Sequence, residues 1–429
     1  MDTEVSTIKN LKNGLTILHT PTLCSNTKTS AIYVFVRVGS IDEEYQERGI
    51  SHFLEHLLFN GTSKRKSYTE IFKDVDDIGA EMNAYTQRDC TCFHITFPNR
   101  YIKEAVDILE DILFHTNIST EKIEKEKLIV MEEENTIRND AEDLTYKYIF
   151  SMIFGEQYLG LDPIGGRKFI QNYNFNLVNK FKNKHYSPNN MIISVSSKYS
   201  PEKIFEHLKP FEKHHNLKSS KVHIPFEIPI QTKPQITILE EFSNQYVLGI
   251  GYISLGINDP RVYAMNYINV ILGRMYSSLL FDDLRTKHNL VYSVLSDIDS
   301  YKESGIFMIY CEMDRKNFYK VLERTLIVLN DVATKGISLK IYNKVRKSIN
   351  NTLINTDNDS SSIAELRGKQ YLYKNKTFSD KELIKKYMSV SLKDINQLSK
   401  EILDFNKINI LAQGRLSKNR ILNMIKPYL

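Results

Sequence analysis

The sequence predicts an α+β protein with two homologous domains, each a mainly antiparallel sheet with helices packed on it. The chain has 429 residues, more than one hydrophobic core of ordinary size supports. The order of strands and helices expected in the first half recurs in the second half. Between the halves, residues 216–234 contain Ser219-Ser220 and three prolines, a composition typical of an extended linker. We therefore expect the domains to be residues 1–215 and 235–429.

In the first half, turn signals and apolar periodicity predict a series of elements in order. The Asn13-Gly14 pair, between apolar runs, favours a hairpin over residues 11–18. The long apolar run at 29–38 predicts a buried strand. The following elements are then expected: helices at 51–59 and 68–78, strands at 81–85 and 91–97, and helices at 99–115 and 121–135.

The second half repeats this succession. Its apolar patterns predict strands at 236–240 and 245–253, helices at 260–272 and 277–287, strands at 291–296 and 305–312, and a helix at 317–335. The repetition is the main reason to expect two domains of similar architecture.

Composition and charge exclude several classes of protein. Hydrophobic residues make up 41% and charged residues 25% of the chain, and the net charge is only +5. The densest basic cluster is Lys64-Arg65-Lys66, which we interpret as a solvated loop rather than a nucleic-acid-binding patch. No stretch reaches the roughly 18 apolar residues that a membrane span requires. We therefore expect neither a nucleic acid nor a membrane as a partner.

The N-terminal segment and the cysteines favour the cytoplasm. The segment MDTEVSTIKNLKNG lacks the basic and apolar regions of a secretory signal, and it is acidic and free of Arg, unlike a transit peptide. Only four cysteines occur, with no Cys-x-x-Cys pair, so a disulfide scaffold is not expected.

Residues 51–59, SHFLEHLLF, place two histidines and a glutamate in an apolar run. On a helix, His52 and His56 are one turn apart and share a face, with Glu55 at the edge of that face. This is the H-x-x-E-H arrangement of inverted zinc hydrolases. Two such imidazoles can bind one zinc ion, and the carboxylate can take a proton from the metal-bound water. The motif predicts a zinc site with Glu55 as general base.

A catalytic zinc ion usually has three protein ligands, so the third is expected elsewhere. The acidic helix at 121–135 offers three consecutive candidates that point about 100° apart: Glu132, Glu133 and Glu134. Glu126 and Glu133 lie nearly on one face, and 76 residues separate Glu133 from His56. Glu126 is then expected to orient a histidine or the zinc-bound water. Three apolar residues are expected to bury this helix: Leu128, Ile129 and Met131.

Other interpretations of these residues need to be weighed. A histidine in an apolar helix is usually packed in the core, an acidic helix is usually a solvated surface, and H-x-x-E-H arises by chance in roughly 2% of chains of this length. The joint occurrence of motif and acidic helix favours a metal site. A structural zinc site would need four closed, cysteine-rich ligands, which the sequence does not offer.

Several segments resemble the pitrilysin-type zinc peptidases, a family of M16-like inverzincins. The resemblance is greatest to the bacterial members of this family that are similar to the mitochondrial processing peptidase. The family signature is similar to GISHFLEHLLFNGT at 49–62. The helix with the third ligand resembles KEKLIVMEE at 125–133, which favours Glu133 over Glu132. The family's substrate-binding strand resembles IGAEMNAYTQRD at 78–89, which implies substrate contacts for three residues: Asn83, Ala84 and Thr86.

The second half resembles the non-zinc domain of the same family through LRTKHNLVYSV at 284–294. The resemblance implies that Arg285 holds the substrate backbone and that Tyr292 stabilises the developing oxyanion. Asn289 stands where the family usually has Gly, and Asn tolerates a left-handed backbone better than most residues. Leu279 replaces an Arg of the family.

The resemblance also implies a function. The first domain would be the zinc-binding catalytic domain, with one Zn²⁺ per chain and catalytic roles for Glu55, Glu126 and Tyr292. The family's clam-shell chamber has four domains, so this chain is expected to form a homodimer or to pair with a homologous partner subunit. The expected activity is a zinc-dependent metalloendopeptidase that cleaves unfolded peptides or presequence-like segments inside the enclosed chamber. A peptide would add as a strand at residues 83–86. The alternative is a non-proteolytic structural or partner subunit of the same fold.

Overall fold

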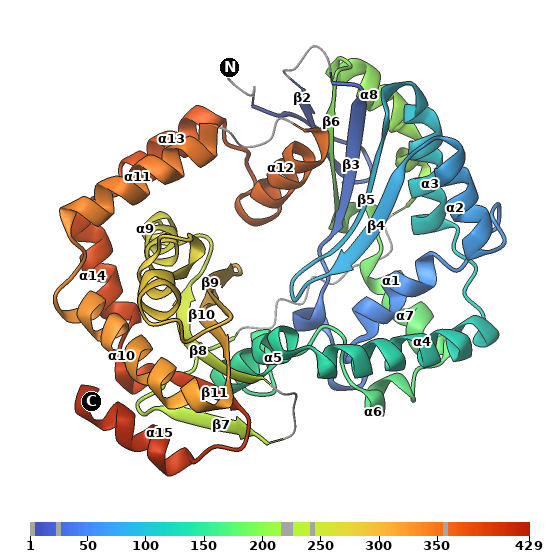
Figure 1. The fold of residues 1–429 in the computed structure, drawn as a ribbon. Helices are drawn as coiled ribbons and strands as arrows, with labels where there is room; N and C mark the ends of the chain where they lie inside the picture. The colour runs from blue at the N-terminus through green and yellow to red at the C-terminus, as the bar shows by residue number, and fades with distance from the viewer. Residues whose placement is uncertain (1–4, 23–26, 216–225, 241–244, 355–358) are drawn as a thin grey trace. The chain divides into compact units, whose positions relative to one another are not determined.

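The computed structural model describes residues 5–22, 27–215, 226–240, 245–354 and 359–429, and it contains two compact units (Figure 1). The first unit comprises Met1–Asn135, Leu161–Pro225 and Asn355–Glu382. The second comprises Thr136–Gly160, Phe226–Ile354 and Leu383–Leu429. Each unit has its own sheet with helices packed on it, which confirms the predicted α+β class.

The sheet of the first unit has six strands in the order β1-β2-β6-β3-β5-β4. The strands are β1 (Thr7–Asn10), β2 (Thr16–Pro21), β3 (Thr29–Val36), β4 (Glu81–Thr86), β5 (Thr91–Pro98) and β6 (Met191–Ser197). Only the β2–β6 pair is parallel, so the sheet is mainly antiparallel, as predicted. Strand β4, which carries the predicted substrate-binding residues, lies at the edge of the sheet.

Both faces of this sheet are covered. Along β3, Ala31, Tyr33 and Phe35 point to one face and the alternate residues to the other, and all are buried. Helix α12 (Ser360–Lys374) packs on the first face. Three helices lie on the opposite side (Figure 1): α2 (Tyr68–Asp77), α3 (Ile102–Phe114) and α8 (Pro201–His207). Because neither face is solvated, β3 reads as a continuous apolar run rather than an alternating one.

The remaining helices of the first unit form the region of the candidate site. They are α1 (Ile50–Leu58), α4 (Thr120–Asn139), α6 (Arg167–Ile170) and α7 (Phe175–His185). Helix α1 packs on β4, β5 and α7. The division between the units falls within α4, after Asn135.

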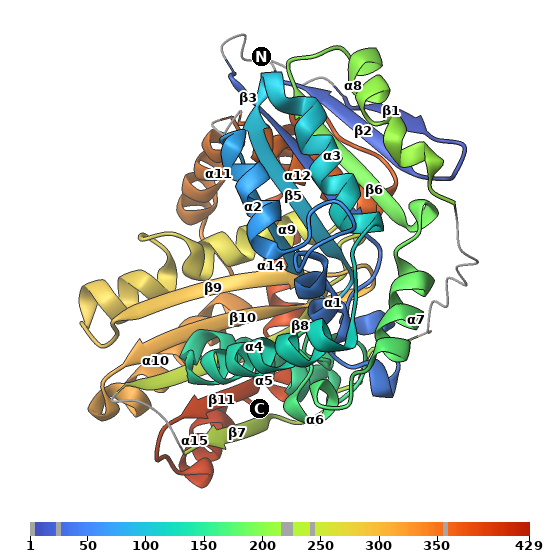
Figure 2. The same cartoon turned by 90° about the vertical axis from the view of Figure 1, so that its right-hand side faces the viewer.

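The sheet of the second unit has five strands in the order β7-β11-β8-β10-β9 (Figure 2). The strands are β7 (Gln235–Leu239), β8 (Tyr246–Leu255), β9 (Ser293–Ser300), β10 (Ser304–Met313) and β11 (Asn409–Gln413). The helices are α5 (Ala141–Phe154), α9 (Val262–Asn269), α10 (Phe318–Thr334), α11 (Leu339–Ile354), α13 (Asp380–Met388), α14 (Leu392–Ile402) and α15 (Lys418–Ile425). Two π-helical turns follow α9, at Val270–Arg274 and Phe281–Lys287. Only the β7–β11 pair is parallel.

Each unit contains a helix from the other half of the sequence. Helix α5 lies on β8, β10 and β11, where Gln413 Nε2 donates to Ala141 O at 2.9 Å. Gly251 of β8 lies against Ile149 of α5. A Cβ at this position would lie 2.3 Å from Ile149 Cγ2, so the close packing of helix on strand requires glycine. Helix α12 is joined to β3 by the Ser360 hydroxyl, which donates to Thr29 O at 2.7 Å.

The linker expected at 216–234 lies partly outside the described residues, which resume at Phe226. The domain limits 1–215 and 235–429 therefore stay a prediction. The placement of α5 and α12 is a separate feature that the succession of elements does not indicate.

The basic cluster at 64–66 is not a fully solvated loop, and the expectation was wrong for Arg65. Its side chain is 7% exposed, and the guanidinium pairs with three carboxylates at 2.7–2.8 Å: Asp74 on α2 and Asp107 and Asp111 on α3. Lys64 and Lys66 are exposed. Arg65 therefore ties the loop to two helices by charge-assisted hydrogen bonds.

No helix among the described residues has the length and apolar character needed to cross a membrane. Of the four cysteines, Cys24 lies outside the described residues, and the other three are buried and free of disulfides: Cys90, Cys92 and Cys311.

Candidate active site

Helix α1 positions the residues of the H-x-x-E-H motif. Five apolar residues of the helix are buried: Ile50, Phe53, Leu54, Leu57 and Leu58. The N-cap is Gly49, whose φ of 88° lies in the left-handed region. A Cβ there would lie 2.6 Å from the carbonyl oxygen of Ile164, so only glycine fits where the helix begins.

A buried carboxylate substitutes for the missing cap side chain. Glu43 Oε2 accepts a hydrogen bond from Gly49 N at 2.6 Å, and Glu43 Oε1 accepts one from Ser51 N at 2.9 Å. These backbone N–H groups have no partner within the helix. Sequence reasoning missed Glu43, because nothing in the motif indicates a carboxylate eight residues before Ser51.

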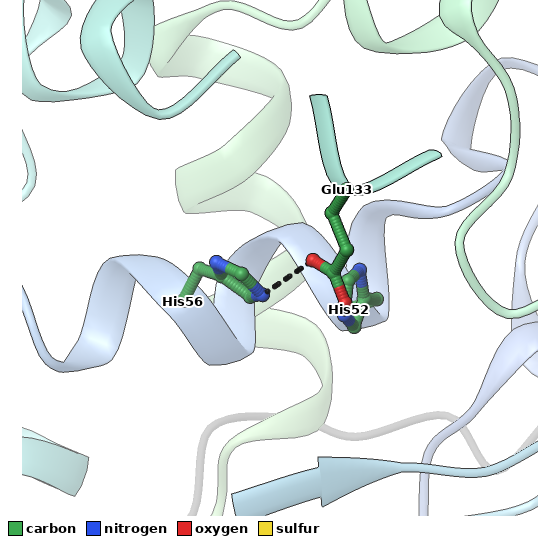
Figure 3. A group of neighbouring side chains, drawn as sticks. All are labelled: His52, His56 and Glu133. Atoms are coloured by element: carbon green, nitrogen blue, oxygen red, sulfur yellow. Dashed lines mark ion pairs between the residues drawn. The ribbon is translucent and has the colours of Figure 1, made fainter. Parts of the chain in front are cut away.

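His52, His56 and Glu133 converge on one point (Figure 3). His56 Nε2 lies 3.3 Å from Glu133 Oε2, and His52 Nε2 lies 3.6 Å from Glu133 Oε1. The candidate ligand atoms of the three residues all lie within 4.8 Å of one another. Two imidazole nitrogens and one carboxylate oxygen are the donor set of many catalytic zinc sites, so these residues fit a zinc ion.

Of the three consecutive glutamates on α4, Glu133 is the one beside the histidines. Glu132 is exposed, and its Oε2 accepts a hydrogen bond from Asn135 Nδ2 at 3.2 Å. Glu134 is buried and does not belong to the cluster. The helical turn of about 100° per residue separates the three side chains in this way.

The expected apolar contact of α4 was wrong for Leu128 and Ile129, which are 67% and 55% exposed. The buried residues of the helix are Ile123, Glu126, Lys127, Val130 and Glu134. The buried face of the helix therefore contains both apolar and charged residues, among them Glu126. Leu128 and Ile129 lie on the other side of the helix and are exposed to solvent.

Glu126 connects α4 to His56. Its Oε1 lies 2.9 Å from His56 Nδ1, and its Oε2 accepts a hydrogen bond from Asn60 Nδ2 at 2.5 Å. A carboxylate on Nδ1 holds a proton there, so Nε2, which lies beside Glu133, is the ring nitrogen available to a metal ion. Asn60 lies four residues after His56 and was not among the predicted site residues.

Glu55 is buried at 8% exposure and is held by Thr86. The Thr86 hydroxyl donates to Glu55 Oε2 at 2.7 Å. Burial raises the pKa of Glu55, although His52 and the Thr86 hydrogen bond oppose this effect. A carboxyl with a raised pKa is better suited to accept a proton near neutral pH. Thr86, expected to contact substrate, thus contacts the candidate base.

The charges in the cluster favour a cation. Burial lowers the pKa of His56, but the carboxylates of Glu126 and Glu133 outweigh it and raise this pKa to about 10. Hydrogen bonds to His52 and His56 lower the pKa of Glu133 well below its usual value. The carboxylates of Glu126 and Glu133 thus stabilise a positive charge beside them, which a proton or a metal ion can provide.

The predicted substrate-binding residues Asn83 and Ala84 lie on the free edge of β4. Asn83 pairs with His94 and Ala84 with Phe93 on β5. The Asn83 side chain is exposed, and its Oδ1 accepts a hydrogen bond from Ala84 N at 2.8 Å. The substrate-binding roles of Asn83 and Ala84 stay predictions.

Arg285 and Tyr292 belong to the second unit and lie next to each other there. Arg285, in the second π-helical turn, donates from Nη1 to Val291 O and, at 3.2 Å, to Tyr292 O. Tyr292 is 50% exposed. A hydrogen bond to Asp314 raises the pKa of Tyr292, so its hydroxyl stays protonated. Asn289 adopts φ 48°, the left-handed conformation expected of this substitution for Gly. The substrate-binding roles of Arg285 and Tyr292 stay predictions.

Comparison with known proteins identifies the family. Residues 22–165 match the family model described as Insulinase (Peptidase family M16), and residues 172–349 match the model described as Peptidase M16 inactive domain. The chain is similar to the uncharacterized zinc protease YmxG of Bacillus subtilis, with 28% identity over 394 residues, which is 91% of this chain and 94% of that protein.

Solved structures share the fold. A protease from Helicobacter pylori has a TM-score of 0.87 at 21% identity, covering 96% of this chain and 99% of that one. A chain of complex III2 from Candida albicans, with Inz-5 bound, has a TM-score of 0.81 at 19% identity, covering 98% and 99%. The two family models span both halves of the sequence, and the relatives cover nearly its whole length. The chain therefore belongs to the M16 peptidase family, and the relatives that it matches are named as uncharacterized zinc proteases.

Proposed function

We propose that this protein is a zinc-dependent metalloendopeptidase that cleaves unfolded peptides or presequence-like segments. One Zn²⁺ per chain would be held by His52, His56 and Glu133. The observation that carries the proposal is the convergence of these three side chains within 4.8 Å, with Glu55 on the same helix as both histidines. The relatives named zinc proteases support it.

The protein's own residues would divide the chemistry between them. Bound zinc supplies a Lewis acid and lowers the pKa of water to about 7. Glu55 would accept the proton of the attacking water and pass it to the leaving amine, and Thr86 would hold the carboxylate in place through its hydrogen bond. Glu126 would keep the His56 ring in the orientation that presents Nε2.

Substrate would bind by its backbone. The free edge of β4 at Asn83–Thr86 would pair with an extended peptide, and main-chain hydrogen bonds tolerate many sequences. Arg285 would hold a peptide carbonyl, and Tyr292 would donate to the oxyanion. We propose a homodimer or a homologous partner subunit that completes an enclosed chamber, and a cytoplasmic location.

The test is a metal analysis combined with cleavage of a quenched fluorescent peptide. Purified protein is expected to cleave the peptide, and a chelator is expected to stop cleavage until zinc is restored. Glu55→Gln is expected to retain zinc and lose cleavage, because it removes only the proton acceptor. Glu132→Gln, on the exposed side of α4, is the matched control and should cleave at the wild-type rate.

The outcome also decides the alternative of a non-proteolytic subunit. The fold alone does not separate the two functions, since a chain of complex III2 shares it. Protein that holds zinc but cleaves no unfolded peptide would favour the alternative. Full activity in Glu55→Gln would instead show that the proposed base is wrong.

A further inference from the structure

A second group of metal-ligating side chains lies at the C-terminal end of α3, apart from the predicted zinc ligands. It consists of Glu110 on α3, His115 at the end of this helix, and His214 after the 3₁₀ turn Lys209–Lys213. Glu110 Oε1 lies 3.2 Å from His115 Nε2 and 2.5 Å from His214 Nε2. The three candidate ligand atoms lie within 4.8 Å of one another.

Glu110 Oε1 has more nitrogen neighbours than it has lone pairs. Lys213 Nζ also approaches this oxygen, at 2.9 Å, so three nitrogen atoms surround it. A carboxylate oxygen offers about two lone-pair positions. The three nitrogens therefore share one carboxylate oxygen, whereas a single cation between the carboxylate and both imidazoles would be bound by all three candidate ligand atoms.

The surrounding structure fixes both histidines. His115 N donates to Asp111 O at 2.8 Å, and Ser63 N donates to His115 O at 3.0 Å. Asn13 Nδ2 donates to His214 O at 3.0 Å, and the His214 ring stacks on Phe114 with centroids 3.9 Å apart. Ligands that are held before binding lose little freedom when the ion arrives, which favours affinity.

The cluster combines a buried charge with access from solvent. The Glu110 side chain is 7% exposed and that of His214 is 14% exposed, whereas His115 is 39% exposed. Lys213 is 58% exposed, so its ammonium group can leave for solvent when an ion binds.

We propose that Glu110, His115 and His214 form a second binding site, for a divalent transition-metal ion, with zinc as the first candidate. Two imidazoles and one carboxylate suit zinc, and a fourth position remains for water. The 3.2 Å between Glu110 Oε1 and His115 Nε2 is close to the roughly 3.3 Å that separates ligands placed 2.0–2.1 Å from a tetrahedral ion. The 2.5 Å between Glu110 Oε1 and His214 Nε2 is a hydrogen-bond distance, so this pair must move apart when an ion binds. Because Lys213 competes, this site fills at a higher zinc concentration than the predicted catalytic site. The proposal does not depend on peptidase activity.

The test measures zinc binding with the predicted catalytic site removed. The full chain with His52→Ala and Glu133→Gln is dialysed against buffered free zinc, and bound metal is counted. One zinc per chain is expected at saturation, against two without these changes. Adding His115→Asn or His214→Asn should weaken the remaining binding by more than about tenfold. Circular dichroism checks that each variant is folded, and the visible absorption of bound Co²⁺ gives an independent readout.

Lys213→Ala separates a metal site from a purely ionic cluster. If Lys213 competes with the ion, its removal tightens zinc binding by roughly two- to fivefold, as loss of one exposed charge pair allows. If His52→Ala, Glu133→Gln protein binds no zinc, or if His214→Asn leaves its binding unchanged, the proposal is overturned.

Discussion

At the scale of single residues, the sequence predicted side chains that share a helix and missed contacts that only folding creates. His52, Glu55 and His56 follow from the helical period. The acidic helix left Glu132 and Glu134 as rivals of Glu133, and the family resemblance favoured Glu133 over Glu132. The hydrogen bond from Thr86 to Glu55 could not be predicted from spacing, because it depends on how β4 packs on α1.

The choice among the glutamates of α4 can be checked by zinc affinity. We expect Glu133→Gln to weaken zinc binding at the His52 site by about a hundredfold or more, because an anionic ligand is lost. Glu132→Gln changes the same charge on the exposed side of the helix and should leave affinity unchanged. Competition against a fluorescent zinc chelator measures both constants, and equal losses in the two variants would contradict the assignment.

Thr86 is expected to act by positioning Glu55. Thr86→Val keeps the shape and removes the hydroxyl, so we expect kcat to fall by roughly tenfold or more while zinc content stays unchanged, because hydrogen bonds to charged groups are strong. Thr86→Ser restores the hydroxyl and should recover most of the rate. A Ser variant as slow as the Val variant would show that packing, rather than the hydrogen bond, explains the loss.

Tyr292 is expected to donate to the oxyanion. Tyr292→Phe should lower kcat by about a hundredfold with little change in KM, as loss of one oxyanion donor does in other hydrolases. Tyr276, which is 88% exposed in the same unit, provides the matched control as Tyr276→Phe. Steady-state kinetics on one peptide compares the two, and a normal kcat in Tyr292→Phe would remove this residue from the mechanism.

At the scale of elements, the sequence predicted best where one periodicity dominates. The expected strands at 81–85 and 91–97 correspond to β4 and β5, and the expected helix at 317–335 corresponds to α10. The helix expected at 277–287 is instead a π-helical turn over Phe281–Lys287, which contains Arg285. Apolar spacing does not distinguish a π turn from an α-helix over so short a stretch, and π turns are frequent at functional sites.

The loop at 62–66 is predicted to depend on Arg65 for stability. Arg65→Leu should lower the free energy of unfolding by about 3 kcal/mol, since it leaves the buried Asp111 carboxylate without its charged partner. Lys64→Ala removes only an exposed ion pair with Asp107 and should cost less than about 1 kcal/mol. Urea unfolding of both variants tests the difference, and similar midpoints would mean that the buried network contributes little.

At the scale of the whole molecule, the sequence predicted two sheets but did not predict which helices pack on each sheet. Periodicity shows that a helix has an apolar face and does not show which sheet buries that face. Helix α12 lies on β3 and β6 although more than 160 residues separate it from β6 in the chain, and α5 lies on strands that come later in the sequence.

Acid is predicted to destabilise the protein through buried histidines. Burial lowers the pKa of His19 and of His185 from 6.5 to about 4. Between pH 4 and pH 6.5, these two histidines bind more protons in the unfolded chain than in the folded protein. The free energy of unfolding therefore falls as the pH decreases from 6.5 to 4.

His19→Gln isolates one of these contributions. The loss of stability between pH 7 and pH 5 should be smaller by about 2 kcal/mol in this variant, because one imidazole no longer titrates. His215→Gln, at an exposed position, should leave the pH dependence unchanged. Thermal unfolding at both pH values provides the measurement, and parallel behaviour of all three proteins would show that His19 does not cause acid sensitivity.

The location of α12 also affects how the protein can be synthesised. During translation, the ribosome completes the six strands of the first sheet at Ser197 but reaches the end of α12 only at Lys374. At about 5–20 residues per second, the apolar face around Tyr33 and Phe35 is left without this helix for on the order of ten seconds or more. A nascent chain of this kind is a natural client for chaperones that shield exposed sheets. Truncation anywhere before α12 should yield an aggregating fragment rather than a folded domain.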